Sequence, residues 1–253
     1  MELVDHFREL RYRLIVSLVA IAAVSVVALV FYSPLLEVVL WPVRRAIVLY
    51  QEAHPGARVE LVTNGLTSAF SLYFKVCVMA GFIVACPFWL LQLWRFVAPG
   101  LEAKDRRTAL KFMLPAVPLF LAGVALGYWV TPRGFAVLLG FNPPSVVNLN
   151  DLNSYLTFEM RLLIVFGAAF LLPVVIVMLN RVGVLSATAL ARGRRFAIIA
   201  CAAFAMVVTP TTDALTMLML AVPMMIMYVV AEMICRAHDR RLRAPREQQA
   251  VAQ

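Results

Sequence analysis

Six long apolar runs, separated by short charged segments, dominate this sequence of 253 residues. The runs cover residues 14–36, 76–94, 112–130, 162–180, 196–208 and 214–231. An α-helix needs about 20 apolar residues to cross the roughly 30 Å hydrocarbon core of a bilayer. The sequence therefore predicts an all-α, polytopic membrane protein with six transmembrane helices, of which the last two are short.

The composition excludes a water-soluble domain, because 63% of the residues are hydrophobic, 15% are charged and the mean hydropathy is +0.87. No run of Gly, Ser or charge is long enough to act as an interdomain linker, so residues 1–253 are expected to form a single membrane domain. The first apolar run is longer than the core of a secretory signal and lacks a small-residue cleavage site, so we expect it to remain attached.

Basic residues cluster on one side of the predicted spans. They precede the first span and follow the second, fourth and sixth, where residues 236–253 form a basic tail. Because Lys and Arg are enriched in cytoplasmic loops, both termini are predicted to be cytoplasmic. The net charge of +9 does not indicate nucleic acid, since no basic stripe is interleaved with stacking aromatics. Anionic lipid headgroups are the expected partners of these residues.

Two segments outside the spans have predicted structure. Residues 1–13 carry Leu3, Phe7 and Leu10 at helical spacing, which predicts a short amphipathic helix on the cytoplasmic side. Residues 33–70 form the longest outer loop, and residues 35–50 within it are expected to be helical. This loop is predicted to be a structured cap.

Proline is frequent inside the predicted spans, at Pro87, Pro115, Pro118, Pro173 and Pro223. Each proline removes a backbone hydrogen bond and kinks its helix, which predicts a curved, concave wall of helices. The 13 residues from 196 to 208 reach only about 20 Å as a helix. Either this hairpin tilts, with Arg194 and Arg195 extending to the interface, or the bilayer thins beside it.

No metal-ligand cluster, nucleophile motif or phosphate-binding loop is present in the sequence, so neither an enzyme nor a cofactor is expected. The candidate binding residues are three acids near the predicted cytoplasmic edge: Glu9, Glu102 and Asp105. Partly shielded carboxylates bind guanidinium groups through two parallel hydrogen bonds. The alternative is an internal salt bridge, for which Arg13 is correctly spaced from Glu9.

Several motifs together resemble the TatC family, the receptor subunits of the twin-arginine protein translocase. The amino-terminal signature resembles His6-Phe7-Arg8-Glu9-Leu10-Arg11, and the first cytoplasmic loop resembles Phe96-Val97-Ala98-Pro99-Gly100-Leu101 followed by Asp105-Arg106-Arg107. The fourth span is similar around Ser154-Tyr155-Leu156-Thr157-Phe158 and Phe166-Gly167, and the last outer turn around Val208-Thr209-Pro210 with Asp213. The resemblance covers essentially the whole chain.

The resemblance implies that Glu9 and Asp105 bind the two consecutive arginines of a signal peptide, with Glu102 as a helper. Further motif positions are occupied by Arg11, Phe96, Pro99, Pro42, Tyr155 and Asp213. Signal-peptide contact is inferred for the first three of these, with a structural role as the alternative, and a partner-binding or structural role for the others.

This chain departs from the family pattern at two positions. The loop acid is usually Glu, whereas this chain has the shorter Asp105. Leu171 occupies a position in the fourth span where the family commonly has Glu, which meets partner subunits. Glu159 and Arg161 either supply this polarity from elsewhere in the span or only mark the membrane interface.

The resemblance implies a bacterial or archaeal cytoplasmic membrane protein that binds twin-arginine signal peptides. It also implies single-span TatA and TatB partners, an oligomeric assembly and export of folded proteins driven by the proton motive force. One alternative is a secondary transporter for a small solute, which would have inverted repeats and broken helices at the midplane. Another is a purely structural scaffold, in which Glu9 and Asp105 would be expendable.

Overall fold

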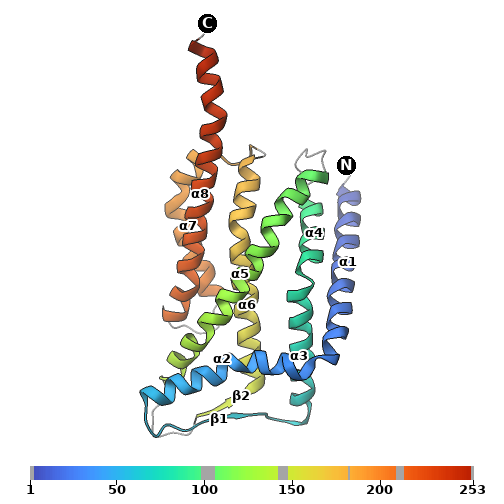
Figure 1. The fold of residues 1–253 in the computed structure, drawn as a ribbon, viewed down its shortest axis with the longest axis vertical. Helices are drawn as coiled ribbons and strands as arrows, with labels where there is room; N and C mark the ends of the chain where they lie inside the picture. Colours follow the sequence, from blue (N-terminus) through green and yellow to red (C-terminus); the bar gives the residue numbers. More distant parts are fainter. Residues whose placement is uncertain (1–2, 98–105, 142–147, 182, 209–213, 252–253) are drawn as a thin grey trace. The chain divides into compact units, whose positions relative to one another are not determined.

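The computed structural model describes residues 3–97, 106–141, 148–181, 183–208 and 214–251 (Figure 1). Within these ranges the helices are α1 (Leu3–Val30), α2 (Tyr32–Ala53), α3 (Leu66–Val84), α4 (Cys86–Val97), α5 (Arg106–Leu139), α6 (Leu152–Arg181), α7 (Ala187–Val208) and α8 (Ala214–Val251). Two strands, β1 (Val59–Val62) and β2 (Asn148–Asp151), complete the fold. The chain divides into two compact units, Met1–Gly167 and Ala168–Gln253, so α6 passes from the first into the second.

In the first unit, α1 packs against α3 and α4. The segment expected as a separate amphipathic helix forms the first turns of α1, because nothing between Leu3 and Val30 interrupts the helix. The helices cross very closely at Gly81, where an added Cβ would lie 2.0 Å from the Ser25 hydroxyl and 2.9 Å from the carbonyl oxygen of Ile21. Only glycine allows α3 to approach α1 in this way.

The predicted kink at Pro87 is confirmed as a complete break. Helix α3 ends at Val84 and α4 begins at Cys86, so Pro87 lies in the first turn of a new helix, where its missing N–H costs nothing. The Trp89 indole N–H donates a 3.0 Å hydrogen bond to the carbonyl oxygen of Phe82 across the break. By contrast, α5 continues through its three prolines and α6 through Pro173.

The predicted cap contains α2 and β1, which lie at the end of the first unit opposite the amino-terminal end of α1 (Figure 1). The helix expected over residues 35–50 is confirmed as part of α2, which packs against α5 and α3. β1 pairs in parallel with β2, from Val59 opposite Asn148 to Val62 opposite Asp151. Neither strand is predicted from the sequence pattern.

Buried side chains from α2, α3 and α6 form the main core of the first unit. Its members are Val39, Leu40, Val43, Leu72, Val76, Met79, Tyr155, Leu156 and Leu163. Packing in this core therefore holds the cap helix α2 against α3 and α6.

Among the residues that the structure describes, five helical segments are long and apolar enough to cross a membrane: Phe7–Val30, Thr67–Val84, Leu114–Leu139, Leu152–Arg181 and Met217–Arg240. The fifth predicted span lies in α7, whose first turns carry three arginines and whose apolar part is confined to residues 196–208. Helix α8 is 38 residues long and extends well past the predicted apolar run of residues 214–231. The largely polar residues that follow this run are also helical.

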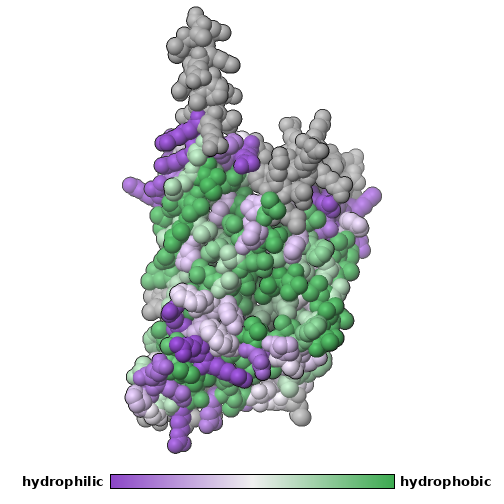
Figure 2. All heavy atoms as spheres, in the orientation of Figure 1, coloured by the Kyte–Doolittle hydropathy of each residue, from purple (hydrophilic) through white to green (hydrophobic). Residues whose placement is uncertain are grey.

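In the second unit, α7 packs against α8. A small core of Ala187, Leu190 and Cys235 joins them, with Ile176 and Val177 of α6 packed against it. Figure 2 shows apolar side chains covering the middle of the helices on the face drawn, with hydrophilic side chains around α2 and near the upper edge of the coloured atoms. This surface is typical of a protein whose solvent is lipid.

Candidate functional site

Glu9 lies near the amino-terminal end of α1, where its side chain is 27% exposed. The Arg13 guanidinium, one turn later, donates a 3.0 Å hydrogen bond from Nε to Oε1 of Glu9 and contacts the same oxygen through Nη2. The internal salt bridge considered from spacing is therefore confirmed. Pairs of this kind contribute about 0.3–0.5 kcal/mol, so the carboxylate is held only weakly.

The other predicted binding residues fall into two groups. Arg11 is exposed on α1, and Phe96 is half-buried near the end of α4. Pro99, Glu102 and Asp105 lie outside the described residues. The structure therefore describes one of the three predicted acids.

An apolar groove of about 280 Å³ lies between α1 and the α3–α4 pair. Its lining residues are Leu10, Arg13, Leu14, Ser17, Leu18, Ile21, Phe82, Trp89, Gln92, Leu93 and Phe96. Arg13 belongs both to the groove and to the Glu9 ion pair, and Phe96 is one of the predicted signal-peptide-binding residues. The groove itself was missed, because its two walls are far apart in the sequence.

Pro42 and Tyr155, two of the predicted partner or structural residues, are buried in the first unit. The backbone of α2 has no donor at Pro42, and the hydroxyl of Tyr128 donates a 2.7 Å hydrogen bond to the carbonyl oxygen of Val38, four residues earlier. The Tyr155 ring packs edge-on against Phe135, with centroids 4.8 Å apart. These contacts favour the structural alternative for both residues.

Glu159 is completely buried on α6, whereas Arg161 is exposed on the same helix. Residues two positions apart point in different directions on a helix, as the sequence indicated. Glu159 therefore presents no polar group at the surface of its unit. Leu171 is half-buried in the second unit, and Asp213 lies outside the described residues.

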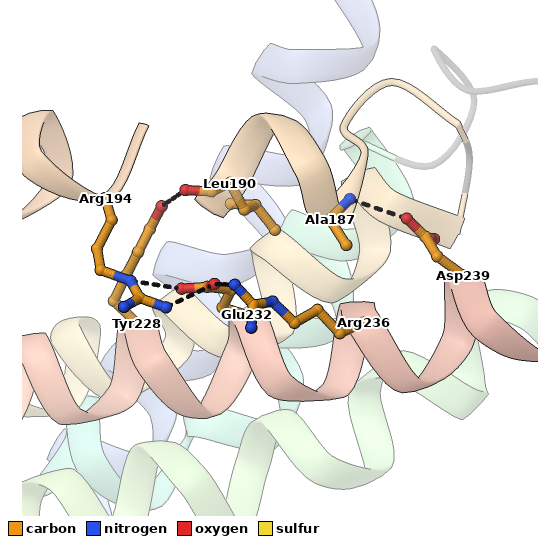
Figure 3. A network of polar contacts seen from close by, with 7 residues as sticks. All are labelled: Ala187, Leu190, Arg194, Tyr228, Glu232, Arg236 and Asp239. Carbon is orange, nitrogen blue, oxygen red and sulfur yellow. Dashed lines mark hydrogen bonds and ion pairs between the residues drawn. The ribbon is translucent and has the colours of Figure 1, made fainter. Parts of the chain in front are cut away.

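A polar network in the second unit was not predicted (Figure 3). Glu232 of α8 is 1% exposed and accepts hydrogen bonds from Arg194 of α7, at 3.0 Å from Nε and 2.8 Å from Nη2. Arg236, one turn along α8, pairs with the same carboxylate. The Tyr228 hydroxyl donates to the carbonyl oxygen of Leu190 at 2.8 Å. Arg194 therefore links α7 to α8 through Glu232. The expectation from the sequence was that Arg194 would extend to the membrane interface.

Asp239 joins the three helices of the second unit at one end. Its carboxylate accepts a 2.9 Å hydrogen bond from the backbone N–H of Ala187, the first residue of α7, and one of 3.0 Å from the side-chain amide of Asn180 in α6. A carboxylate at the start of a helix satisfies a free N–H group and interacts favourably with the helix dipole. The sequence offered a signal for this contact, because Asp239 is an acid that stands among arginines at this end of α8.

The comparisons with known proteins agree with the motifs. A family model described as Sec-independent protein translocase protein (TatC) matches residues 5–223. The protein of that name from Xylanimonas cellulosilytica is 38% identical over 241 residues, covering 95% of this chain and 86% of the relative. The one from Deinococcus radiodurans is 38% identical over 251 residues, covering 99% and 90%.

A crystal structure described as the twin arginine translocase receptor TatC has the same fold. It matches with a TM-score of 0.74 at 28% identity, covering 92% of this chain and 98% of the other. The chain therefore belongs to the TatC family of Sec-independent protein translocase proteins, which are polytopic helical membrane proteins.

Proposed function

We propose that this protein is the signal-peptide receptor and core subunit of a twin-arginine translocase, which exports folded proteins using the proton motive force. Family membership along nearly the whole chain supports this function. The observation that carries it is the placement of Glu9, the acid of the amino-terminal signature. It is partly exposed near the end of α1, and its contact among the described residues is Arg13 of the same helix, which also lines an apolar groove.

Recognition would proceed by exchange of guanidinium partners. A signal-peptide arginine approaching Glu9 replaces or joins Arg13, whose pairing contributes little. Arg13 contacts the carboxylate through one oxygen, Oε1, so a peptide arginine that binds both oxygens through two parallel hydrogen bonds gains a larger contribution than Arg13 does. We propose Asp105 for the second arginine, with Glu102 assisting and Arg11, Phe96 and Pro99 shaping the site.

We further propose the surroundings in which the receptor works. Both termini are cytoplasmic, the basic residues contact anionic lipids, and the two compact units act as one membrane domain in a bacterial or archaeal cytoplasmic membrane. Single-span TatA and TatB subunits are its partners in an oligomer. Pro42 and Tyr155 shape the cap, while Leu171 and Asp213 mark the positions for partner contact.

Crosslinking to a twin-arginine peptide tests the receptor function. The variant with both Glu9→Ala and Asp105→Ala is expected to lose the crosslink while remaining folded in the membrane. The variant Glu52→Ala with Glu60→Ala removes two acids from the opposite end of the first unit and should crosslink normally. Undiminished crosslinking in the first variant would reject this site.

A single substitution separates the receptor site from a structural salt bridge. Arg13→Gln releases Glu9 from its internal partner. If Glu9 receives the peptide, this variant should bind it at least as tightly as the wild type. If the ion pair only supports α1, binding should fall together with thermal stability.

A further inference from the structure

Glu159 is the most unusual ionisable residue in the described part of the first unit. It lies in α6, within the Leu152–Arg181 membrane segment, and its exposed fraction is 0%. Neither carboxyl oxygen makes a hydrogen bond of normal geometry. Among the residues that the structure describes, no lysine, arginine or histidine forms an ion pair with it.

The side chains around Glu159 explain why it has no cationic partner. Among the described residues, the titratable groups that face it are the hydroxyls of Tyr155, one turn earlier on α6, and Tyr128 of α5. Tyr128 already donates to the carbonyl oxygen of Val38. From α2, the core contributes the apolar side chains of Val39 and Val43. The buried face of α2 therefore contributes no charged side chain near Glu159.

Lys75, a cation within the Thr67–Val84 membrane segment, contacts another face of α6. Lys75 of α3 donates hydrogen bonds to Thr157 at 2.9 Å and to Asn153 at 3.3 Å. Thr157 is two residues before Glu159, and side chains at that spacing point in different directions on a helix. Helix α6 thus separates the lysine from the acid, and the ammonium satisfies its hydrogen bonds without the carboxylate.

A buried carboxylate without a cation is far more costly than a neutral carboxylic acid, because its lost hydration is not replaced. Ionisable residues kept inside membrane segments are commonly parts of proton pathways. We propose that Glu159 is an intramembrane proton-binding site, whose proton is released and regained during export. In this step the carboxyl O–H bond breaks and the proton passes to a water molecule. The carboxylate later takes a proton from another water, so the cycle leaves Glu159 unchanged.

The alternative role is purely structural, as a neutral acid that fills the core. Glutamine separates the two roles, because Glu159→Gln keeps the size and polarity of the neutral acid but cannot release a proton. Glu159→Asp keeps a titratable group in case the glutamine variant is poorly assembled. Glu60→Gln, at the exposed residue of strand β1, is the matched control for loss of one carboxyl group.

The experiment uses infrared difference spectroscopy and export assays on the full-length protein in membranes. The wild type should show the carbonyl stretch of a protonated carboxylic acid, and this band should be absent in Glu159→Gln and present in Glu60→Gln. Export by Glu159→Gln should fall by about tenfold or more, since a proton donor has been removed. Export by Glu159→Asp should remain closer to wild type.

Two results would overturn the proposal: the absence of a band that depends on Glu159, or wild-type export by Glu159→Gln. The inference uses the proposed function only for the export measurement. Peptide crosslinking distinguishes a failure of the proton-binding proposal from a failure of the receptor function. The variants Glu159→Gln, Glu159→Asp and Glu60→Gln should all retain the crosslink. Loss of crosslinking upon Glu9 and Asp105 substitution tests the receptor site, whatever the spectrum of Glu159.

Discussion

The hydroxyl of Tyr128 donates a 2.7 Å hydrogen bond to the carbonyl oxygen of Val38, which lies four residues before Pro42. In an uninterrupted helix this carbonyl would accept from the N–H of residue 42, which proline lacks. Tyr128 of α5 therefore replaces a bond that the sequence of α2 removes. This relationship joins the cap helix to a membrane helix through one side chain.

Replacing this tyrosine should weaken the cap. Tyr128→Phe keeps the ring that stacks on Trp41 and removes only the hydroxyl. We expect a loss of about 0.5–1.5 kcal/mol in the free energy of unfolding, the usual contribution of one hydrogen bond. Thermal unfolding in detergent measures it. The same change in a Pro42→Ala background should cost less, since the backbone then has its own donor, and equal costs would contradict this explanation.

The crossing of α1 and α3 should not tolerate a side chain at residue 81. An added Cβ would meet the Ser25 hydroxyl at 2.0 Å, and it would also lie 2.9 Å from backbone atoms of Ile21 and Ser25, which cannot rotate away. Gly81→Ala is expected to destabilise the protein by about 1–3 kcal/mol. Gly193→Ala is the control, because nothing lies within 4 Å of that position. Equal melting temperatures for both variants would show that the helices are not closely packed at Gly81.

The two arginines that contact Glu232 should not contribute equally to stability. Arg194 makes two hydrogen bonds from another helix, whereas Arg236 pairs with the acid one turn away on α8. Arg194→Ala should give the larger loss of stability, because it removes the two hydrogen bonds by which Arg194 joins Glu232 to α7. Arg236→Ala should cost about 0.3–0.5 kcal/mol, as for pairs one turn apart on a helix, because Arg194 still pairs with the buried carboxylate. Thermal unfolding of both variants tests the order, and a larger loss for Arg236→Ala would contradict it.

The start of α6 should respond to acid. Asp151 accepts hydrogen bonds from the Ser154 hydroxyl at 2.8 Å and from its backbone N–H at 2.9 Å, and these hold the pKa of the Asp151 carboxyl below its ordinary value. A lowered pKa adds stability above the unfolded value of about 4, and this stability is lost as the pH falls through the folded value. Ser154→Ala should therefore lower the melting temperature at neutral pH more than at about pH 2. An equal decrease at both pH values would show that the carboxylate does not cap this helix.

Much of this fold was predictable because membrane spans depend on local composition. The apolar runs located the membrane helices, Pro87 located the break between α3 and α4, and the spacing of Glu9 and Arg13 predicted their ion pair. Each of these features depends on residues close together in the chain.

The features that were missed depend on distant residues. Arg194 and Glu232 are 38 positions apart, and β1 pairs with a strand almost ninety residues later. The groove combines α1 with α3 and α4. Hydropathy also cannot indicate where a helix ends when polar residues continue it, as in α8. The acid Glu159 was noticed in the sequence, but its burial follows from packing in the first unit.

A double-mutant cycle on peptide binding tests the receptor function most directly. It combines Glu9→Gln in the protein with Arg→Gln at each of the two consecutive arginines of the peptide, and compares the dissociation constants of the purified protein in detergent. If Glu9 binds one arginine, the two changes should be coupled by about 1.5–3 kcal/mol for that arginine. Strictly additive effects at both arginines would show that Glu9 does not contact the signal peptide.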